Sequence, residues 1–479
     1  MNVLSELEPR SVFRFFEELC AIPHGSYHTE AVGDYLVSFA RSRALRHRRD
    51  EANNVIIWKD ATAGYENAPA VMLQGHTDMV CEKDEDCAKN METEGLDLFV
   101  EGDVVGARGT TLGADDGIAV AMCLAVLDAD DIAHGPLECL FTADEEVGMI
   151  GARALDVSDL KAEYLLNLDS EAEKVLTVSC AGSARAVCTL PVRRESFSGE
   201  RLTLTVDGLI GGHSGEEIHK GRANANMLLG RALCELSGTT ELRLVELRGG
   251  SKDNAIPRSA SAQLVVSDAS TARGAAEALD AVLKNEYRTA DGGVSLRLVP
   301  GAGDLPPMDA DSTRRVSRFL FCAPNGVQMM SAEVPGLVQT SLNLGQAYSE
   351  AEQAVFRFMI RSSVNSQKDE TTQRVAELVR ALGGEIEISA SYSAWEYRAD
   401  SRLRGIVSEA FRAVYGEEPE IAALHAGLEC GILSGKMPHL DCISYGPDLT
   451  NVHTPGERLH IASAQRVWRL TVETLKRIR

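Results

Sequence analysis

The first part of the chain alternates between short apolar runs and longer stretches of mixed polarity. Nearly continuous apolar runs at residues 71–73, 137–141 and 164–166 predict buried strands, because strands covered on both faces carry little polar surface. Residues 118–127 lie between the first two runs and are apolar on nearly every side, which predicts a buried helix. This alternation predicts an α/β fold whose mostly parallel sheet is flanked by helices.

The pattern changes at about residue 184. Leu202, Leu204 and Val206 alternate with polar residues, which is typical of a strand with one exposed face. Further strands are expected at residues 262–266, 338–344 and 355–360, and helices at residues 224–236, 270–284 and 369–382. The similar order of elements in the two halves of this region predicts an α+β domain made of two duplicated, ferredoxin-like halves.

The first pattern returns after about residue 393. Helices are expected at residues 403–415 and 462–478, and a buried strand at residues 440–445. We therefore expect a discontinuous first domain of residues 1–183 and 393–479, interrupted by an inserted domain of residues 184–392.

Composition narrows the class of protein. A chain of 479 residues with 44% hydrophobic content is too long for one core, which agrees with two domains. A net charge of -23 disfavours nucleic acid and anionic membranes as partners. The N-terminus lacks the features of a signal peptide, and the longest apolar run is shorter than the ~20 residues of a membrane helix. The 11 cysteines contain no CxxC pair, so we expect reduced thiols and a cytoplasmic protein.

Acidic and imidazole side chains follow each of the predicted buried strands. They are His76 and Asp78, then the acidic run 144–146, then Asp169, and finally His453 after the strand at residues 440–445. Asp115 opens the apolar helix. Ligands of parallel α/β sheets bind at the carboxyl ends of the strands, so these clusters can meet at one point. One such residue alone is usually a turn or a helix cap, but together they match the ligands that zinc and similar metals take.

Five segments give the chain a family resemblance. They are GHTDMV (residues 75–80), GADDG (113–117), DEEVG (144–148), NLDSE (167–171) and HTPGE (453–457). In this order they resemble the M20 metallopeptidases. Two further segments, MVCEK (79–83) and HAGLEC (425–430), are similar to the branch of aminoacyl-histidine dipeptidases, also called cytosolic nonspecific dipeptidases. The resemblance spans nearly the whole chain.

The resemblance implies two divalent metal ions per chain, with zinc expected first and cobalt or manganese as alternatives. One ion would be held by His76, Asp115 and Asp169, and the other by Asp115, Glu146 and His453, so that Asp115 bridges them. It also implies a cis peptide bond between Asp115 and Asp116.

The resemblance also assigns the remaining roles. Glu145 would be the general base for a water that bridges the metals, and Asp78 would fix the imidazole of His76. The inserted domain would be a lid that supplies His213 to stabilise the oxyanion. The substrate would be bound by His213, Asn254, Arg361 and Gly427.

The expected activity is hydrolysis of small unblocked dipeptides, including Xaa-His dipeptides such as β-alanyl-histidine. An N-acyl amino acid deacylase or amidohydrolase on the same scaffold would keep the same metal ligands and is the main alternative. A non-catalytic binding protein is disfavoured, because Glu145 and all five ligands are present. A homodimer and a monomer both stay open, since relatives include dimers and a duplicated lid can complete the site within one chain.

Overall fold

The computed structural model describes residues 3–479, which form two compact units. Unit 1 comprises Met1–Ser179, Tyr397–Ala423 and Leu428–Arg479, and unit 2 comprises Cys180–Glu396 and Leu424–Gly427. The short segment Leu424–Gly427 therefore differs from the predicted division, which assigned it to the first domain. The reason is local, because the backbone N–H of Ala181 donates to the carbonyls of Leu424 and Ala426, both at 3.0 Å.

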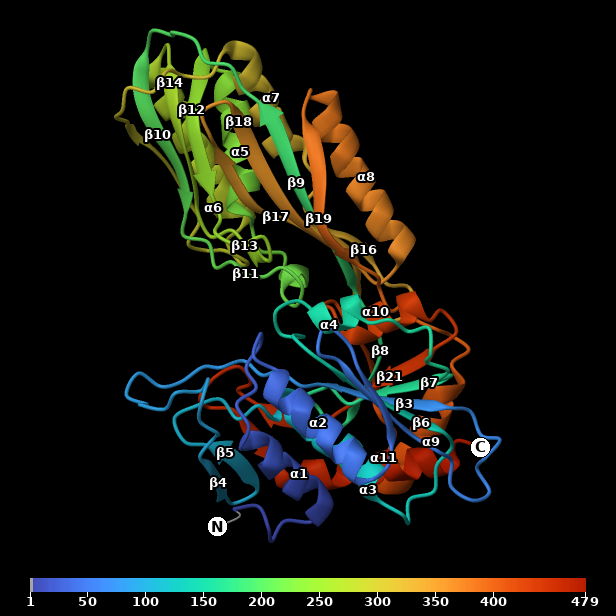
Figure 1. Ribbon diagram of the computed structural model, residues 1–479. Helices are drawn as coiled ribbons and strands as arrows, with labels where there is room; N and C mark the ends of the chain where they lie inside the picture. The colour runs from blue at the N-terminus through green and yellow to red at the C-terminus, as the bar shows by residue number, and fades with distance from the viewer. Residues whose placement is uncertain (1–2) are drawn as a thin grey trace. The chain divides into compact units, whose positions relative to one another are not determined.

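An eight-stranded mixed sheet forms the centre of unit 1 (Figure 1). Its order is β1 (Arg46–Arg49), β2 (Val55–Lys59), β6 (Leu137–Thr142), β3 (Val71–His76), β7 (Tyr164–Asn167), β21 (Asp441–Ser444), β8 (Val175–Cys180) and β20 (Glu420–Leu424). The neighbours β6, β3, β7 and β21 pair in parallel, whereas β1, β2 and β8 pair with their neighbours antiparallel. The parallel character that the sequence predicts is thus limited to the four central strands, which are buried along their whole length.

Seven helices belong to the described part of unit 1. They are α1 (Arg10–Cys20), α2 (Glu30–Ser42), α3 (Ala114–Asp128), α4 (Ile150–Ala154), α9 (Arg402–Tyr415), α10 (Glu429–Lys436) and α11 (Ile461–Arg477). Helix α3 packs against both β3 and α1, which explains why residues 118–127 are apolar all round and are buried.

A small sheet of unit 1 carries the loop of His453. Its strands are β4 (Leu98–Glu101), β5 (Val104–Ala107), β22 (Leu449–Thr450) and β23 (Arg458–His460), in the order β22-β23-β5-β4. The loop from residue 451 to residue 457 joins β22 to β23 and contains both His453 and Glu457.

Unit 2 contains a nine-stranded sheet. Its path is β15 (Ser295–Pro300), β10 (Glu200–Asp207), β14 (Ala260–Val266), β12 (Leu242–Gly249), β17 (Val338–Ser349), β18 (Gln353–Ser362), β9 (Gly182–Pro191) and β19 (Glu385–Tyr392), with β16 (Gly326–Met330) paired to β17. Between β12 and β17 only two residue pairs connect the two halves of this sheet. A separate ribbon pairs β11 (Gly212–His213) with β13 (Ala255–Ile256).

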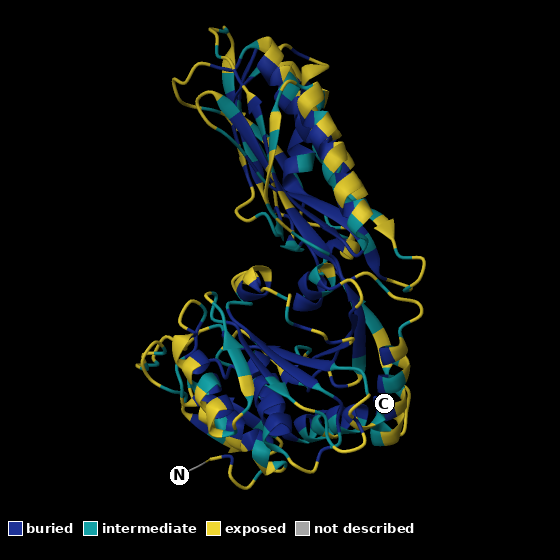
Figure 2. Ribbon diagram, turned by 45° about the vertical axis from the view of Figure 1, so that its right-hand side comes forward, coloured by how far each residue is buried: buried dark blue, intermediate teal, exposed yellow. Residues whose placement is uncertain are grey.

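Helices cover one face of this second sheet. They are α5 (Ala225–Ser237), α6 (Ala269–Glu286), α7 (Ala310–Cys322) and α8 (Asn365–Ala381), and the short 3-10 helix η1 (Ile218–Lys220) follows β11. Strand β10 alternates between buried and partly exposed residues, as predicted for a strand with one open face. Each unit has its own large hydrophobic core, and Figure 2 shows the buried residues gathered along the strands of both sheets.

None of the helices among the described residues is long and apolar enough to cross a membrane. None of the 11 cysteines, which all lie within residues 3–479, forms a disulfide.

Candidate metal centre

The carboxyl ends of the four parallel strands meet at one edge of the unit 1 sheet. The last residue of β3, His76, pairs with Thr142 at the end of β6. The last residue of β7, Asn167, pairs with Ser444 at the end of β21. The side chains that follow these ends are therefore brought to the same edge, as the sequence predicts.

Four of the five predicted ligands form one connected group, in which Asp115 contacts both histidines and His453 contacts Glu146. The Nε2 atom of His76 lies 3.1 Å from Oδ1 of Asp115, and Nε2 of His453 lies 3.1 Å from Oδ2 of the same carboxylate. The Nε2 atom of His453 also lies 2.8 Å from Oε1 of Glu146. Asp115 thus presents one oxygen to each histidine, which is the arrangement expected of a bridging ligand.

The fifth predicted ligand, Asp169, lies on the His76 side of the centre. Its Oδ1 atom is 3.9 Å from Nε2 of His76. Two sets of potential metal ligands occur among the described residues, one of His76, Asp116 and Asp169 and one of His76, Asp115 and Glu146, each with its ligand atoms within 4.8 Å of one another. Ligands of a tetrahedral zinc ion, at ~2.0–2.1 Å from the metal, lie about 3.3 Å apart, so the donor set fits a divalent cation in chemistry and in spacing.

The backbone around Asp115 is unusual. The peptide bond between Asp115 and Asp116 is cis, which confirms the prediction, and neither residue has helical backbone angles although both lie in the first turn of α3. Gly113 precedes the helix with a φ of 64°, in the left-handed region that favours glycine. The Oδ2 atom of Asp116 accepts a hydrogen bond from the backbone N–H of His76 at 3.2 Å, and its carboxylate also lies close to Asp169, within the first of the two sets.

The electrostatics of the centre favour a bound cation. Burial lowers the pKa of the His76 imidazole, but hydrogen bonds with Asp115 and Asp78 outweigh it and raise the pKa well above its usual value. Hydrogen bonds with Asp115 and Glu146 raise the pKa of His453 to about 10. Burial and the neighbouring carboxylate of Asp116 raise the pKa of Asp169. A buried site in which carboxylates outnumber imidazoles is stabilised by added positive charge.

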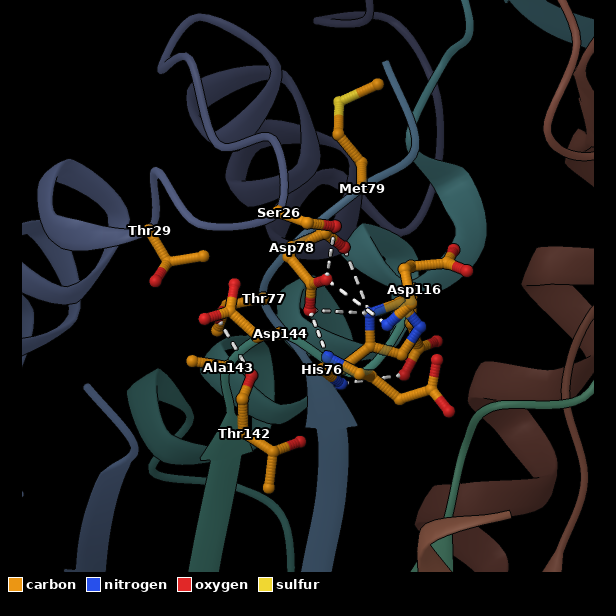
Figure 3. A network of polar contacts seen from close by, with 12 residues as sticks. Ser26, Thr29, His76, Thr77, Asp78, Met79, Asp116, Thr142, Ala143 and Asp144 are labelled. Carbon is orange, nitrogen blue, oxygen red and sulfur yellow. Dashed lines mark hydrogen bonds and ion pairs between the residues drawn. The ribbon is translucent and has the colours of Figure 1, made fainter. Parts of the chain in front are cut away.

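Asp78 lies close to Ser26 and His76 just after the end of β3 (Figure 3), and its carboxylate connects this strand end to the loop of Glu145 and Glu146. Its Oδ1 atom accepts the backbone N–H of Glu145 at 2.8 Å, and its Oδ2 atom accepts the N–H of Glu146 at 3.3 Å and the hydroxyl of Ser26 at 2.8 Å. The Nδ1 atom of His76 lies 2.9 Å from the main-chain oxygen of Asp78, closer than the 3.6 Å to its carboxylate. The imidazole tautomer is therefore set by the main chain of Asp78, while the carboxylate orients the loop that carries Glu145.

Glu145 lies in the same acidic surroundings. Burial raises the pKa of Glu145 to about 8, opposed by His76 and reinforced by the charges of Glu429 and Glu146. Glu429, the first residue of α10, is fully buried and accepts hydrogen bonds from Gln74 at 2.5 Å and Thr142 at 2.6 Å. Glu429 lies within the HAGLEC segment but was not among the predicted site residues.

Unit 2 brings two predicted residues and one unpredicted residue together around Gly215. A Cβ atom at Gly215 would lie 2.7 Å from the carbonyl of His425, 3.0 Å from Cε1 of His213 and 3.3 Å from Nε of Arg361. His425 is 7% exposed, and its Nε2 atom lies 2.7 Å from the hydroxyl of Ser341. Burial and the charge of Arg361 lower the pKa of His213, and the same two causes lower the pKa of His425 to about 3.

The side chains of this cluster are suited to binding a carboxylate group. Arg361 is 6% exposed, and its Nε atom has no hydrogen-bond partner among the described residues. The carbonyl of Asn254 accepts the N–H of Ser214 at 2.9 Å, next to His213. Gly427 lies two residues beyond His425, where a Cβ atom would collide with the hydroxyl of Tyr392. His425 begins the HAGLEC segment, but it was not among the predicted site residues.

A cavity of about 320 Å³ opens beside Glu146 in unit 1. Met79 and Met91 contribute apolar walls, and Glu82 and Glu92 contribute carboxylates. Among the described residues that line it, none is a lysine or an arginine. Its volume lies at the lower end of the ~300–1,000 Å³ that is typical of small-molecule sites.

The chain is similar to known peptidases over nearly its whole length. The sequence profile of peptidase family M20/M25/M40 matches residues 72–477. The chain is 38% identical over 482 residues to the cytosol non-specific dipeptidase of Escherichia coli (strain K12), covering 100% of this chain and 99% of that relative. The crystal structure of aminoacylhistidine dipeptidase from Vibrio alginolyticus is 38% identical with a TM-score of 0.91, covering 99% of this chain and 98% of that chain. The aminopeptidase PepT of Bacillus cereus, at 13% identity with a TM-score of 0.57 over 98% of this chain and 99% of that one, is similar in fold alone.

Proposed function

The chain belongs to peptidase family M20/M25/M40, and from this premise we infer that the protein is a metal-dependent dipeptidase. We propose that it hydrolyses unblocked dipeptides in the cytoplasm, with Xaa-His dipeptides such as β-alanyl-histidine among its substrates. The observation that carries this proposal is the pair of histidines joined through Asp115, with Glu145 next to the ligand Glu146. The names of the two relatives that match the whole chain support the choice of a dipeptide over an acylated amino acid.

We propose that the site holds two divalent ions, zinc first and cobalt or manganese as alternatives. His76, Asp115 and Asp169 would hold one ion, and Asp115, Glu146 and His453 the other. Ions held there would polarise the scissile carbonyl and lower the pKa of water to about 7. Asp78 orients the backbone of Glu145, and the Glu145 carboxylate takes a proton from the attacking water and delivers it to the leaving amine nitrogen.

Unit 2 contains polar groups that the proposed reaction needs besides the metal centre of unit 1. We propose that it acts as a lid over short substrates, with His213 donating a hydrogen bond to the developing oxyanion. The guanidinium of Arg361 suits the C-terminal carboxylate of a dipeptide, and its unpartnered Nε atom supports that role. Asn254 and Gly427 are the two further proposed substrate contacts.

The cavity beside Glu146 suits the other end of a dipeptide. Its carboxylates Glu82 and Glu92 attract an α-ammonium group and repel a carboxylate. Methionine walls adapt to side chains of different shape, which favours a broad rather than a narrow preference. We therefore propose that the N-terminal residue of the dipeptide lies on this side of the site.

A substrate panel tests the proposed function. Purified protein is treated with chelator, supplied with zinc, cobalt or manganese, and assayed with Ala-His, N-acetyl-Ala-His and a ten-residue peptide. We expect rapid hydrolysis of Ala-His only when metal is added, and slow or no hydrolysis of the other two. Faster cleavage of the acetylated compound would show that the protein is a deacylase and not a dipeptidase. Good cleavage of the ten-residue peptide would refute the proposal that unit 2 acts as a lid over short substrates.

A further inference from the structure

Glu457 makes an unusual set of hydrogen bonds close to the metal centre. It lies four residues after His453 and is 2% exposed. Its Oε2 atom accepts the backbone N–H groups of Leu112 at 2.7 Å and Gly113 at 3.0 Å. Its Oε1 atom accepts those of Ala114 at 2.8 Å and Asp115 at 3.3 Å. One carboxylate therefore binds four consecutive N–H groups, the last of which belongs to Asp115.

The backbone of this segment needs such a partner. The first N–H groups of a helix have no acceptor within the helix, and here the preceding residue is Gly113, which has no side chain to cap them. Leu112 and Ala114 are fully buried, so water does not replace a missing acceptor. A negative charge at this position also suits the positive end of the α3 dipole. The acceptor comes from residue 457, 342 positions beyond Asp115.

The same side chain connects two of the proposed ligands. Glu457 and His453 lie in one loop between β22 and β23, and its carboxylate binds the backbone that carries Asp115. Within the cluster, Nε2 of His453 lies 3.1 Å from Oδ2 of Asp115. A shift of Glu457 would move one ligand relative to the other, and ligands of a metal site must keep their separation within a few tenths of an ångström.

We propose that Glu457 is a positioning residue that holds Asp115 and His453 at the separation required by the second metal ion. The proposal rests on the proposed metal-dependent function. It predicts that replacing the Glu457 carboxylate lowers the affinity for metal but leaves kcat of the fully metal-loaded protein nearly unchanged. The effect on the two ions is unequal, since Asp115 and His453 would both hold the second ion, whereas of these two residues only Asp115 would hold the first.

The test compares Glu457→Gln with the matched variant Glu138→Gln. Glu138 is also a buried carboxylate of unit 1, 4% exposed, and it accepts the N–H groups of Lys161 at 2.8 Å and Ala162 at 3.1 Å. It lies near the start of β6, at the opposite end from Thr142. Metal-free full-length proteins are titrated with zinc by calorimetry and with cobalt by visible absorption, and their unfolding temperatures are recorded.

For Glu457→Gln we expect the affinity for the second ion to fall about 10–100-fold, the range typical when a group that orients a ligand is lost. The affinity for the first ion should fall less, and kcat should approach that of the unchanged protein once metal is in excess. Glu138→Gln should keep both affinities even where its unfolding temperature falls. Affinities within twofold of the unchanged protein, or an equal loss in Glu138→Gln, would overturn the proposal.

Glu457→Asp provides a second route if the Gln variant does not fold. It keeps the charge on a side chain one carbon shorter, so an intermediate loss of affinity for the second ion is expected, and unchanged affinity would refute the proposal. No peptide is present in these titrations. Failure to hydrolyse dipeptides would therefore refute the proposed function without deciding the role of Glu457.

Discussion

Asp115 is in contact with three other side chains of unit 1. One oxygen faces His76 and the other faces His453, both at 3.1 Å, while its backbone N–H binds Glu457. These partners come from two other parts of the chain, because His76 ends β3 whereas His453 and Glu457 share the loop between β22 and β23. The geometry of the Asp115 carboxylate thus depends on both of these segments being correctly folded against the start of α3.

Glu145 is the residue whose replacement tests the chemistry most directly. Glu145→Gln keeps the size of the side chain but removes the group that accepts a proton. We expect kcat for Ala-His to fall about 10²–10⁴-fold, the usual contribution of a general base, with both metal ions still bound. Steady-state kinetics and metal analysis of the same sample check this.

Asp144→Asn is the matched control for that experiment. The Asp144 carboxylate accepts the N–H of Tyr27 at 2.6 Å and lies outside the proposed ligand set. Its replacement should reduce kcat far less than Glu145→Gln does. A Glu145→Gln protein that keeps more than a third of its kcat, or that loses its metal, would contradict the assigned role.

The strands predicted from apolar runs are present in the central sheet of unit 1. The buried runs at residues 71–73, 137–141 and 164–166 are strands β3, β6 and β7, and the runs identify the strands because side chains buried on both faces must be apolar. An apolar run does not indicate the direction of its strand, so the antiparallel pairing of β1, β2 and β8 was not predicted. The duplication within unit 2 stays a prediction.

The connection between β3 and the loop of residues 144–148 gives a second prediction. In Asp78→Asn, an amide nitrogen replaces one of the two oxygens that accept the N–H groups of Glu145 and Glu146. We expect kcat/KM to fall about 10–100-fold, as is typical when a group that orients a metal ligand is lost. Ser26→Ala removes only the 2.8 Å hydroxyl contact to Asp78 and should cost much less.

Kinetics of the two variants with excess metal distinguish this role from simple destabilisation. If Asp78→Asn and Ser26→Ala lose activity equally, the loop is not oriented by the two backbone hydrogen bonds. If neither loses activity, Asp78 has no part in positioning Glu145.

Among the described residues, the two large hydrophobic cores share no residue. All five proposed ligands lie in unit 1. A metal stabilises the state that binds it, by about 2.7 kcal/mol for an ion present at a hundred times its dissociation constant. Stability gained from metal should therefore belong to unit 1 alone.

Calorimetry of metal-loaded and chelated protein tests this expectation. We expect two transitions, with chelation lowering only that of unit 1 by about 5–10 °C, given ~2–4 °C per kcal/mol for units of this size. Phe319→Ala identifies the other transition, because Phe319 is fully buried in unit 2 and its ring centroid lies 4.5 Å from that of Phe356. A single transition, or equal shifts of both on chelation, would contradict independent units.

The amino-acid sequence was sufficient to predict which acidic and imidazole side chains gather at the strand ends. His76, Asp115, Glu146 and His453 come together as expected, because short motifs placed after buried strands must reach the carboxyl edge of the sheet. The same motifs led to the cis bond after Asp115. These features depend on a few neighbouring residues, which a sequence displays directly.

Only the tertiary structure showed which contacts surround these side chains. Glu457 binds a segment 342 positions away, His425 lies beside Arg361 around a glycine, and Asp78 uses its main chain for His76 and its carboxylate for the neighbouring loop. A hydrogen bond depends on angle and on tenths of an ångström, and the chain meets those limits only after distant segments have packed together. The residue types at these positions are ordinary, so their roles become visible only in the folded protein.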